Sequence, residues 1–309
     1  MSATTVPFAG PARRLASALE PVAAQVYFSP ECHAAYAALG FGPSPGEANG
    51  VALPDGPAYF TSRGSVMGQV HGSVVAAAFA VFNPAVVVPA VTYGWTLTDA
   101  TTIAAARDEG AIAQLCRILG AEPAGLHRAV QLLLRAVEPL QPAGKPLFAG
   151  LTSLPMPDPP LGVAWRLTDM LREYRGDAHV AAWTGAGFDG PEIGLLTELY
   201  WGLPPRSYVR TRAWSTAELD EAQERLVARG LIEERGEALT EQGRSAREAV
   251  EEETDEMCRP ITDTLGDDVD ELLAILSPWG AQIRAGGGYL PSGPHDLAAR
   301  VSRSDDRSD

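Results

Sequence analysis

The sequence predicts a mainly α-helical protein with two winged-helix-like (MarR-like) domains and small β-wings. Helical periodicity with capping residues recurs along most of the 309 residues. Residues 214–240, WSTAELDEAQERLVARGLIEERGEALT, follow the order of a winged helix: a capped helix, Gly230, an apolar strand, a tight turn and a return strand. Two pairs of similar segments suggest an internal duplication, which would relate the two domains by a pseudo-twofold axis.

The duplication is inferred from segments that occupy the same order in each half. LEPVAAQVYFSPECHAAYAALGF, from Leu19, resembles LREYRGDAHVAAWTGAGF, from Leu171. WTLTDATTIAAARDEG, from Trp95, resembles WSTAELDEAQERLVARG, from Trp214. A cleft between two such domains is a natural place for a ligand.

The first half is expected to be helical throughout. Residues 13–28 place leucine and valine side chains on one helical face. Ser29, Pro30 and Glu31 are typical of the N-cap, first residue and first-turn acid of a helix that continues to Ala38. Further helices, which end near glycine or proline, are expected at residues 60–81, 98–118 and 123–137.

The second half begins after a proline-rich segment. Seven prolines between residues 138 and 160 indicate an extended linker or lid. Helices with apolar faces are expected on both sides of the winged-helix pattern, at residues 161–184, 191–200, 241–256 and 267–276. The predicted organisation is a flexible N-terminus (1–12), an N-terminal helical, degenerate winged-helix-like domain (13–138), a Pro-rich linker (139–160), a C-terminal winged-helix domain (161–290) and a disordered tail (291–309).

The candidate recognition helix has the wrong charge for DNA. In a DNA-binding winged helix this helix enters the major groove, so it is expected to be basic. Here it carries four carboxylates against two arginines, and the candidate wing carries three glutamates against one arginine. Phosphate neutralisation supplies most non-specific DNA affinity, so we do not expect DNA as a partner. A small basic patch at Arg206, Arg210 and Arg212 is the feature that favours DNA.

Composition supports the same expectation. The net charge of −15 and the pI near 4.8 argue against nucleic acids and anionic membranes, but not against small ligands. The three cysteines are far apart and lack metal-ligand spacing, which predicts reduced thiols. The longest apolar run, residues 74–91, contains prolines, so it predicts a core helix and loop rather than a membrane span. With no evident signal peptide, we expect a cytoplasmic protein.

Several segments together resemble a known family. They recur in the same order from about Arg13 to Leu276: LEPVAAQVYFSPE, PLFAGLTSLPMPDPP, LREYRGDAHVAAW, AWSTAELDEAQERLVARGLI and TEQGRSAREAVEEETDEM. The chain thereby resembles the actinobacterial SalK-type family of helix-turn-helix proteins, whose members are frequent beside natural-product biosynthetic genes. The resemblance implies an architecture and a context, and very little chemistry. This chain has Tyr174 where a histidine often stands in that family.

The strongest candidate site lies on the helix expected at 161–184. Steps of three and four residues place Arg172, Arg175 and His179 on one face. Either arginine could grip a substrate carboxylate, and His179 could move a proton if Asp177 or Glu173 orients it. The alternative is a solvated face of self-paired charges, or a buried ion network that joins the two domains.

Other candidates complete this site. Trp183 lies one turn after His179 and could wall an apolar pocket for an aromatic or polyketide-like ligand. The segment AYFTSRGSVMGQVHG brings Tyr59, Arg63 and His71 to the first half, and Glu20 is a further candidate if it faces a cleft. The alternative for these residues is ordinary helix packing.

Motifs for cofactors are missing. No phosphate loop, dinucleotide fingerprint, zinc or iron spacing, or serine-hydrolase elbow is present, so we expect no cofactor and no metal.

Gly176 stands in the middle of the helix that carries His179, where glycine costs about 1 kcal/mol unless something packs closely.

Three function classes therefore stay open. The first is a cofactor-independent enzyme of natural-product biosynthesis that cyclises, isomerises or eliminates by acid/base chemistry in the cleft between the halves. The second is a non-catalytic ligand-binding or self-protection protein, and the third is a winged-helix transcription regulator. A small-molecule ligand is the expected partner. The apolar positions of the helix at 241–256 suit a homodimer interface as well as a core.

Overall fold

The computed structural model describes residues 10–290, so the predicted tail and most of the predicted flexible N-terminus lie outside the described residues. The prediction of a mainly helical protein is confirmed. The helices, in chain order, are α1 (Pro11–Ala24), η1 (Gln25–Phe28), α2 (Pro30–Ala38), α3 (Gly56–Gly64), η2 (Ser65–Met67), α4 (Gly72–Phe79), α5 (Pro84–Leu97), α6 (Ala100–Leu119), α7 (Leu126–Val137), α8 (Pro146–Ser153), α9 (Pro160–Gly185), α10 (Gly190–Tyr200), η3 (Val209–Arg212), α11 (Thr216–Ala228), α12 (Glu241–Met257), α13 (Arg259–Leu265) and α14 (Asp268–Ala285). The strands β1 (Glu47–Ala48) and β2 (Val51–Ala52) pair antiparallel.

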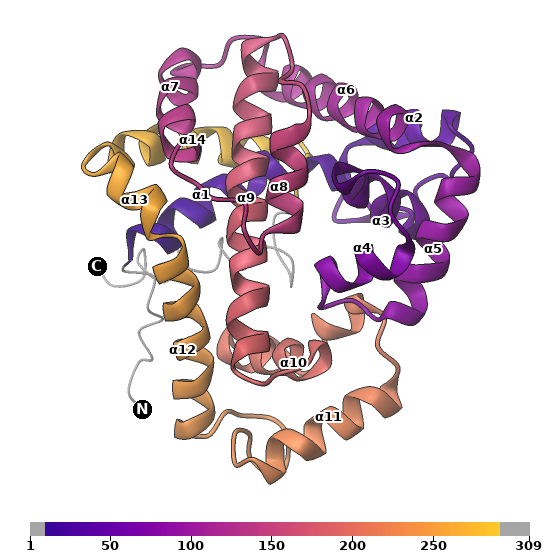
Figure 1. Ribbon diagram of the computed structural model, residues 1–309, viewed down its shortest axis with the longest axis vertical. Coiled ribbons are helices and arrows are strands. Elements are labelled where there is room, and N and C mark those ends of the chain that lie inside the picture. The colour runs from indigo at the N-terminus through magenta and orange to yellow at the C-terminus, as the bar shows by residue number, and fades with distance from the viewer. Residues whose placement is uncertain (1–9, 291–309) are drawn as a thin grey trace.

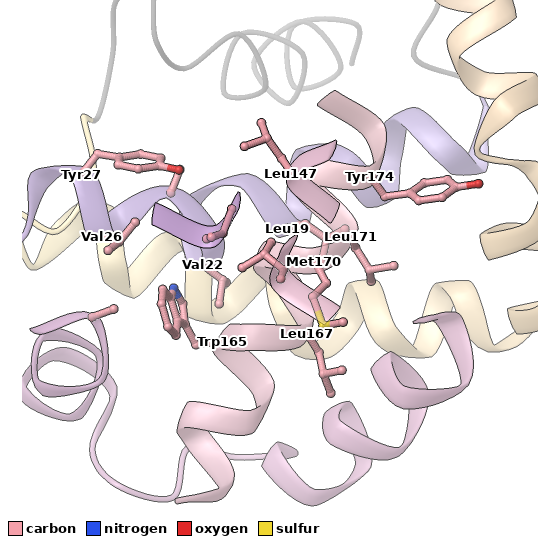
Figure 2. Close-up of a cluster of buried hydrophobic side chains, with 14 of the residues drawn as sticks. Leu19, Val22, Val26, Tyr27, Leu147, Trp165, Leu167, Met170, Leu171 and Tyr174 are labelled. Atoms are coloured by element: carbon pink, nitrogen blue, oxygen red, sulfur yellow. The ribbon is translucent and has the colours of Figure 1, made fainter. Parts of the chain in front are cut away.

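The long helix α9 is the axis of the molecule. It packs against α1, α6, α7, α8 and α12, and it runs from the upper end of the view in Figure 1 down to the level of α10. Its core side chains include Trp165, which is fully buried and donates its indole N–H to the Ala23 carbonyl at 3.2 Å. Figure 2 shows Trp165, Leu167 and Leu171 of α9 beside Leu19 and Val22 of α1. This larger core also contains residues of α13 and α14.

A second, smaller core lies at the other end of α9. It joins Trp183 to apolar side chains of α10, α11 and α12. The helix expected to be capped is α11, and it begins with a capping box formed by Ser215 and Glu218. The wing that follows is reduced to one bridge, between Ile232 and Leu239. This end of the molecule therefore has the element order that the sequence pattern predicts.

The first half differs from the expected winged helix. Between residues 10 and 290, the β1–β2 hairpin precedes α3, and no strand follows α6. The loop from α6 to α7 is too short for a wing: it is residues 120–125, in which Gly120 and Gly125 adopt positive φ values of 82° and 79°. The expectation of a wing in each half is therefore wrong for the first half. The internal duplication stays a prediction.

Several helices also differ from the expected ones. Helix α8 lies inside the segment expected to be an extended linker, because its proline stands at the first helical position, where no N–H is needed. Similarly, Asn83 caps α5 and Pro84 begins it, so the proline expected to stop one helix starts the next. The helix expected at 60–81 is divided into α3, η2 and α4.

Hydrogen bonds near the start of α11 connect the second half of the molecule to the loop between α4 and α5. Trp214 donates its indole N–H to the Val81 carbonyl at 2.9 Å. The Asn83 backbone N–H donates to the Arg212 carbonyl at 2.9 Å, and the Asn83 amide donates to the Glu218 carboxylate at 3.1 Å. The start of α11 is therefore docked on the loop between α4 and α5. The predicted domain boundaries stay predictions, since α9 contributes to both cores.

Candidate functional site

A cavity of about 820 Å³ lies between the two halves of the molecule. Its wall comes from α1, α3 and α4 on one side and from α9, α10, η3 and α12 on the other. The structure brings most of the predicted site residues to this wall: Glu20, Tyr59, Arg63, Arg172, Glu173, Arg175, His179 and Trp183. The remaining two, His71 and Asp177, are not among the residues that line it.

Glu173 is the centre of the first charged cluster. Its carboxylate accepts two hydrogen bonds from Arg63, at 2.9 and 2.8 Å, and one from Arg172 at 2.8 Å. The Tyr27 hydroxyl adds a bond at 3.3 Å, and Arg172 also donates to Glu20 at 2.9 Å. Burial alone would raise the pKa of Glu173, but Arg63 and Arg172 hold it at about 2. Glu173 is therefore ionised at neutral pH, where it holds two arginines in place.

Glu251 is the centre of the second cluster. It accepts from Arg175 at 2.8 Å and from Arg247 at 2.7 Å. Burial opposes its ionisation, yet Arg247, His179 and Arg175 hold the pKa of Glu251 well below its usual range. Arg175 also pairs with Asp255 at 3.0 Å. This cluster joins α9 to α12 beside the cavity.

His179 lies on the same face of α9 and is oriented by Thr254. Its Nδ1 is 3.0 Å from the Thr254 hydroxyl, which itself donates to the Val250 carbonyl at 2.6 Å. Because that hydroxyl has one proton, the network assigns the imidazole proton to Nδ1 and leaves the lone pair on Nε2. Burial, with Arg247 and Arg175, lowers the pKa of His179 to about 4, although Glu251 opposes the shift. At neutral pH the ring is therefore uncharged.

An aromatic wall faces the charged stripe of α9. Tyr59 lies 5.0 Å from Tyr27, 5.2 Å from Phe60 and 5.8 Å from Phe82 between ring centroids. Arg63 stacks over Phe79 at 4.5 Å, and Arg63 donates to the Tyr59 hydroxyl at 3.2 Å. Trp183, also buried, closes the cavity toward the second core. The site thus combines an apolar wall of edge-on and tilted aromatic rings with fixed cations and one imidazole.

Two predicted residues have other positions. His71 is exposed and caps α4, where its Nδ1 accepts from the Ser73 backbone N–H at 3.2 Å. Asp177 accepts the backbone N–H groups of Leu147 and Phe148 at 3.0 Å each, at the start of α8. Burial raises the pKa of Asp177 to about 7, against these two hydrogen bonds. Neither Asp177 nor Glu173 is a hydrogen-bond partner of His179, so the expectation that they orient it is wrong.

The sequence did not predict the place of four residues in this site. Arg212, Arg247 and Glu251 line the cavity, and Thr254 contacts His179. Arg247, Glu251 and Thr254 lie at steps of four and three on α12, and all three are buried. The signal was present, since these polar residues interrupt the apolar face of that helix at helical spacing. Which charged residues of such an acidic helix turn inward depends on α9, which packs against it.

The two arginines at the C-terminal end of the candidate recognition helix, α11, form salt bridges with carboxylates. Arg225 pairs with Asp189 at 2.5 Å and with Glu192 at 3.1 Å, and Arg229 pairs with Glu192 at 3.4 Å. The candidate basic patch is also divided, because Arg206 pairs with Asp220 on α11 at 2.6 Å and Arg212 turns to the cavity.

Among residues 10–290, no group of three or more histidine, cysteine, aspartate or glutamate side chains is arranged to hold a metal ion. Within the same range, every helix is too short or too polar to cross a bilayer.

Comparison with known proteins gives one match. The family model described as "Helix-turn-helix family" matches residues 12–291, which is most of the chain. Neither the curated proteins nor the solved structures contain a match.

Proposed function

Since this chain belongs to the helix-turn-helix family, we propose that it uses the winged-helix scaffold to bind a small molecule and to transfer a proton without a cofactor. The observation that carries the proposal is the position of His179. The ring is fixed through Nδ1 and has a free Nε2 lone pair, and it lines a cavity of about 820 Å³ between the two halves. Cavities of this size suit drug-sized organic ligands.

In this proposal His179 is the general base. An imidazole that is neutral at pH 7 accepts a proton at Nε2 while Thr254 keeps the ring in place. The protonated ring would lie near Glu251, whose charge favours it. The same proton can then return to another atom of the ligand, which is the net chemistry of an isomerisation, a cyclisation or an elimination. Such positioned proton transfers contribute about 10²–10⁴-fold to a rate.

The charged clusters have a positioning role. Glu173 holds Arg63 and Arg172 at the wall, and Glu251 holds Arg175 and Arg247. Fixed guanidinium groups keep ligand oxygens in register with Nε2 without moving during the reaction. Asp177 then supports the site indirectly, through the start of α8.

The proposal also includes a narrower family, a biosynthetic context and a type of ligand. The ordered segments of the sequence support membership in the SalK-type actinobacterial group, and the gene context of that group supports a role in natural-product biosynthesis. The mixture of aromatic wall and cations suits a polyketide-like or aromatic intermediate. A homodimer in the cytoplasm stays part of the same prediction.

A regulator of transcription is the second candidate, and its support is the family membership. The net charge of −15 and the carboxylate partners of Arg225 and Arg229 oppose it. Fluorescence anisotropy of a labelled duplex from the gene's own upstream region, at about 50 mM salt, tests it directly. Saturable, sequence-dependent binding would support the regulator, and the absence of binding would support the small-molecule proposal.

Proton transfer can be tested before the reaction is known. A panel of aromatic and β-keto carboxylic acids is screened by thermal shift, and the stabilising compounds are incubated with protein in D₂O. We expect His179-dependent deuterium incorporation, followed by NMR. The variant His179→Asn keeps an N–H toward Thr254 but lacks Nε2, so it should bind the same compounds without exchange. Equal exchange in the variant would refute His179 as the base, whereas binding without exchange in the wild type would favour the non-catalytic ligand-binding protein.

A further inference from the structure

We infer that the cavity binds an organic anion whose charged group pairs with Arg212 and whose apolar body lies between the aromatic wall and Gly176. The inference rests on the proposed function and names the chemical class of its ligand.

The first observation is the charge of Arg212. Six arginines line the cavity: Arg13, Arg63, Arg172, Arg175, Arg212 and Arg247. Five of them form salt bridges with carboxylates, while Arg212 forms none within residues 10–290. A partly buried cation without a counter-ion is unfavourable, so the cavity lacks one negative charge that a ligand can supply.

The surroundings of Arg212 are arranged to hold it in place. Its guanidinium lies 4.7 Å from the Phe82 ring centroid and 4.4 Å from that of Tyr208, and its Nη2 donates to the Tyr208 hydroxyl at 2.6 Å. Its Nε is buried and has no hydrogen-bond partner within the described chain. A guanidinium stacked on aromatic rings retains its charge and keeps its edge directed, which is the usual arrangement for binding carboxylate, phosphate or sulfonate.

The second observation is the open space beside Gly176. At each of the other glycines in the interior of a described helix, an added Cβ atom would come within 2.8 Å of neighbouring atoms, so close packing explains the residue. At Gly194, for example, it would meet Val209 at 2.4 Å. At Gly176 the nearest atom is a Glu173 oxygen at 3.5 Å, and the residue lines the cavity.

Glycine inside a helix costs about 0.5–1 kcal/mol relative to alanine, and here no protein group uses the space that it leaves. Gly176 follows Arg172 by one turn and precedes His179 by one turn, so it is a flat site on α9 between a cation and the base. The aromatic rings of Tyr59, Phe79 and Phe82 line the same cavity. An apolar body suits the space between these rings and the uncovered surface of α9.

Two dyes with the same ring system test the inference. 8-Anilinonaphthalene-1-sulfonate carries one negative charge, and N-phenyl-1-naphthylamine lacks the sulfonate. Titrations followed by fluorescence should show that the wild type binds the anion at least tenfold more tightly than the neutral dye. Arg212→Gln should lower the affinity for the anionic dye about tenfold and the affinity for the neutral dye less than twofold. Arg212→Lys should recover part of the lost affinity. The matched control is Arg210→Gln, an exposed arginine of the same short helix, which should leave both affinities unchanged.

The apolar part has its own variant. Gly176→Val should lower the affinity for both dyes about tenfold. Gly185→Val, at the C-terminal end of α9 where an added Cβ meets no other atom, should leave both affinities unchanged. Equal affinities for the two dyes, or unchanged anion binding in Arg212→Gln, would overturn the inference and leave the proposed cavity function intact. If neither dye binds the wild type, the cavity itself fails as a small-molecule site, and the inference fails with it. Near-UV circular dichroism of each variant shows that the tertiary structure is retained.

Discussion

Replacement of Glu173 by glutamine tests whether the first charged cluster is a desolvated ion network. The carboxylate is 2% exposed and accepts hydrogen bonds from Arg63, Arg172 and Tyr27. Removing one member of a buried ion pair costs about 3–5 kcal/mol, because the other member is left as an uncompensated buried charge. The side chains of Arg63 and Arg172 are 13% and 20% exposed, so water offsets part of this loss. We therefore expect Glu173→Gln to lower the free energy of unfolding by about 2–4 kcal/mol at pH 7.

Urea unfolding followed by circular dichroism measures the loss, with Glu224→Gln on α11 as an exposed control that should stay within about 0.5 kcal/mol of the wild type. The pH dependence is a second readout. The pKa of Glu173 in the folded protein is about 2, below its ordinary value of 4.5, so the stability that its charge contributes is present above pH 4.5 and is lost as the pH falls toward 2. The difference between the variant and the wild type should shrink across that interval. A loss below about 1 kcal/mol at pH 7, or a difference that does not change with pH, would refute the desolvated network.

Three further predictions follow from the same contacts. His179 has a pKa of about 4 in the fold against 6.5 ordinarily, so the wild type should lose stability relative to His179→Asn as the pH falls from 6.5 to 4. Parallel unfolding curves at pH 7.5 and 4.5 check this, and a constant difference would contradict a ring that stays neutral in the fold. Asp177 has a pKa raised to about 7 from 3.8, so its ionisation opposes folding. Asp177→Asn should therefore become more stable relative to the wild type as the pH rises from about 4 to about 7, which urea unfolding across that range measures. The opposite trend would mean that the α8 backbone N–H groups outweigh burial. Gly176→Ala should raise the free energy of unfolding by about 0.5–1 kcal/mol in thermal or urea unfolding, whereas Gly194→Ala should lower it because its Cβ would lie 2.4 Å from Val209; a destabilised Gly176→Ala would show that the space beside α9 is not open.

The sequence by itself determined which residues of the site share one face of α9. Arg172, Arg175, His179 and Trp183 recur at steps of three and four, and all four side chains line the cavity. The reason is local: hydrogen bonds between residues four apart fix which side chains share a helical face, whatever the helix packs against. The pattern of a capped helix likewise predicted α11, whose capping box is formed by Ser215 and Glu218.

The partners of those side chains were decided by the tertiary structure. His179 is held by Thr254, which lies 75 residues away, and Glu173 accepts from Arg63, which lies 110 residues away. Arg212, which the sequence places in a basic patch, instead turns toward the cavity beside Phe82. Periodicity defines a face but not its neighbour, because the neighbour depends on how the helices pack in three dimensions. Packing then sets the charge states. It places Arg63 and Arg172 beside Glu173, which lowers the pKa of that carboxyl, whereas burial raises the pKa of Asp177 one turn away.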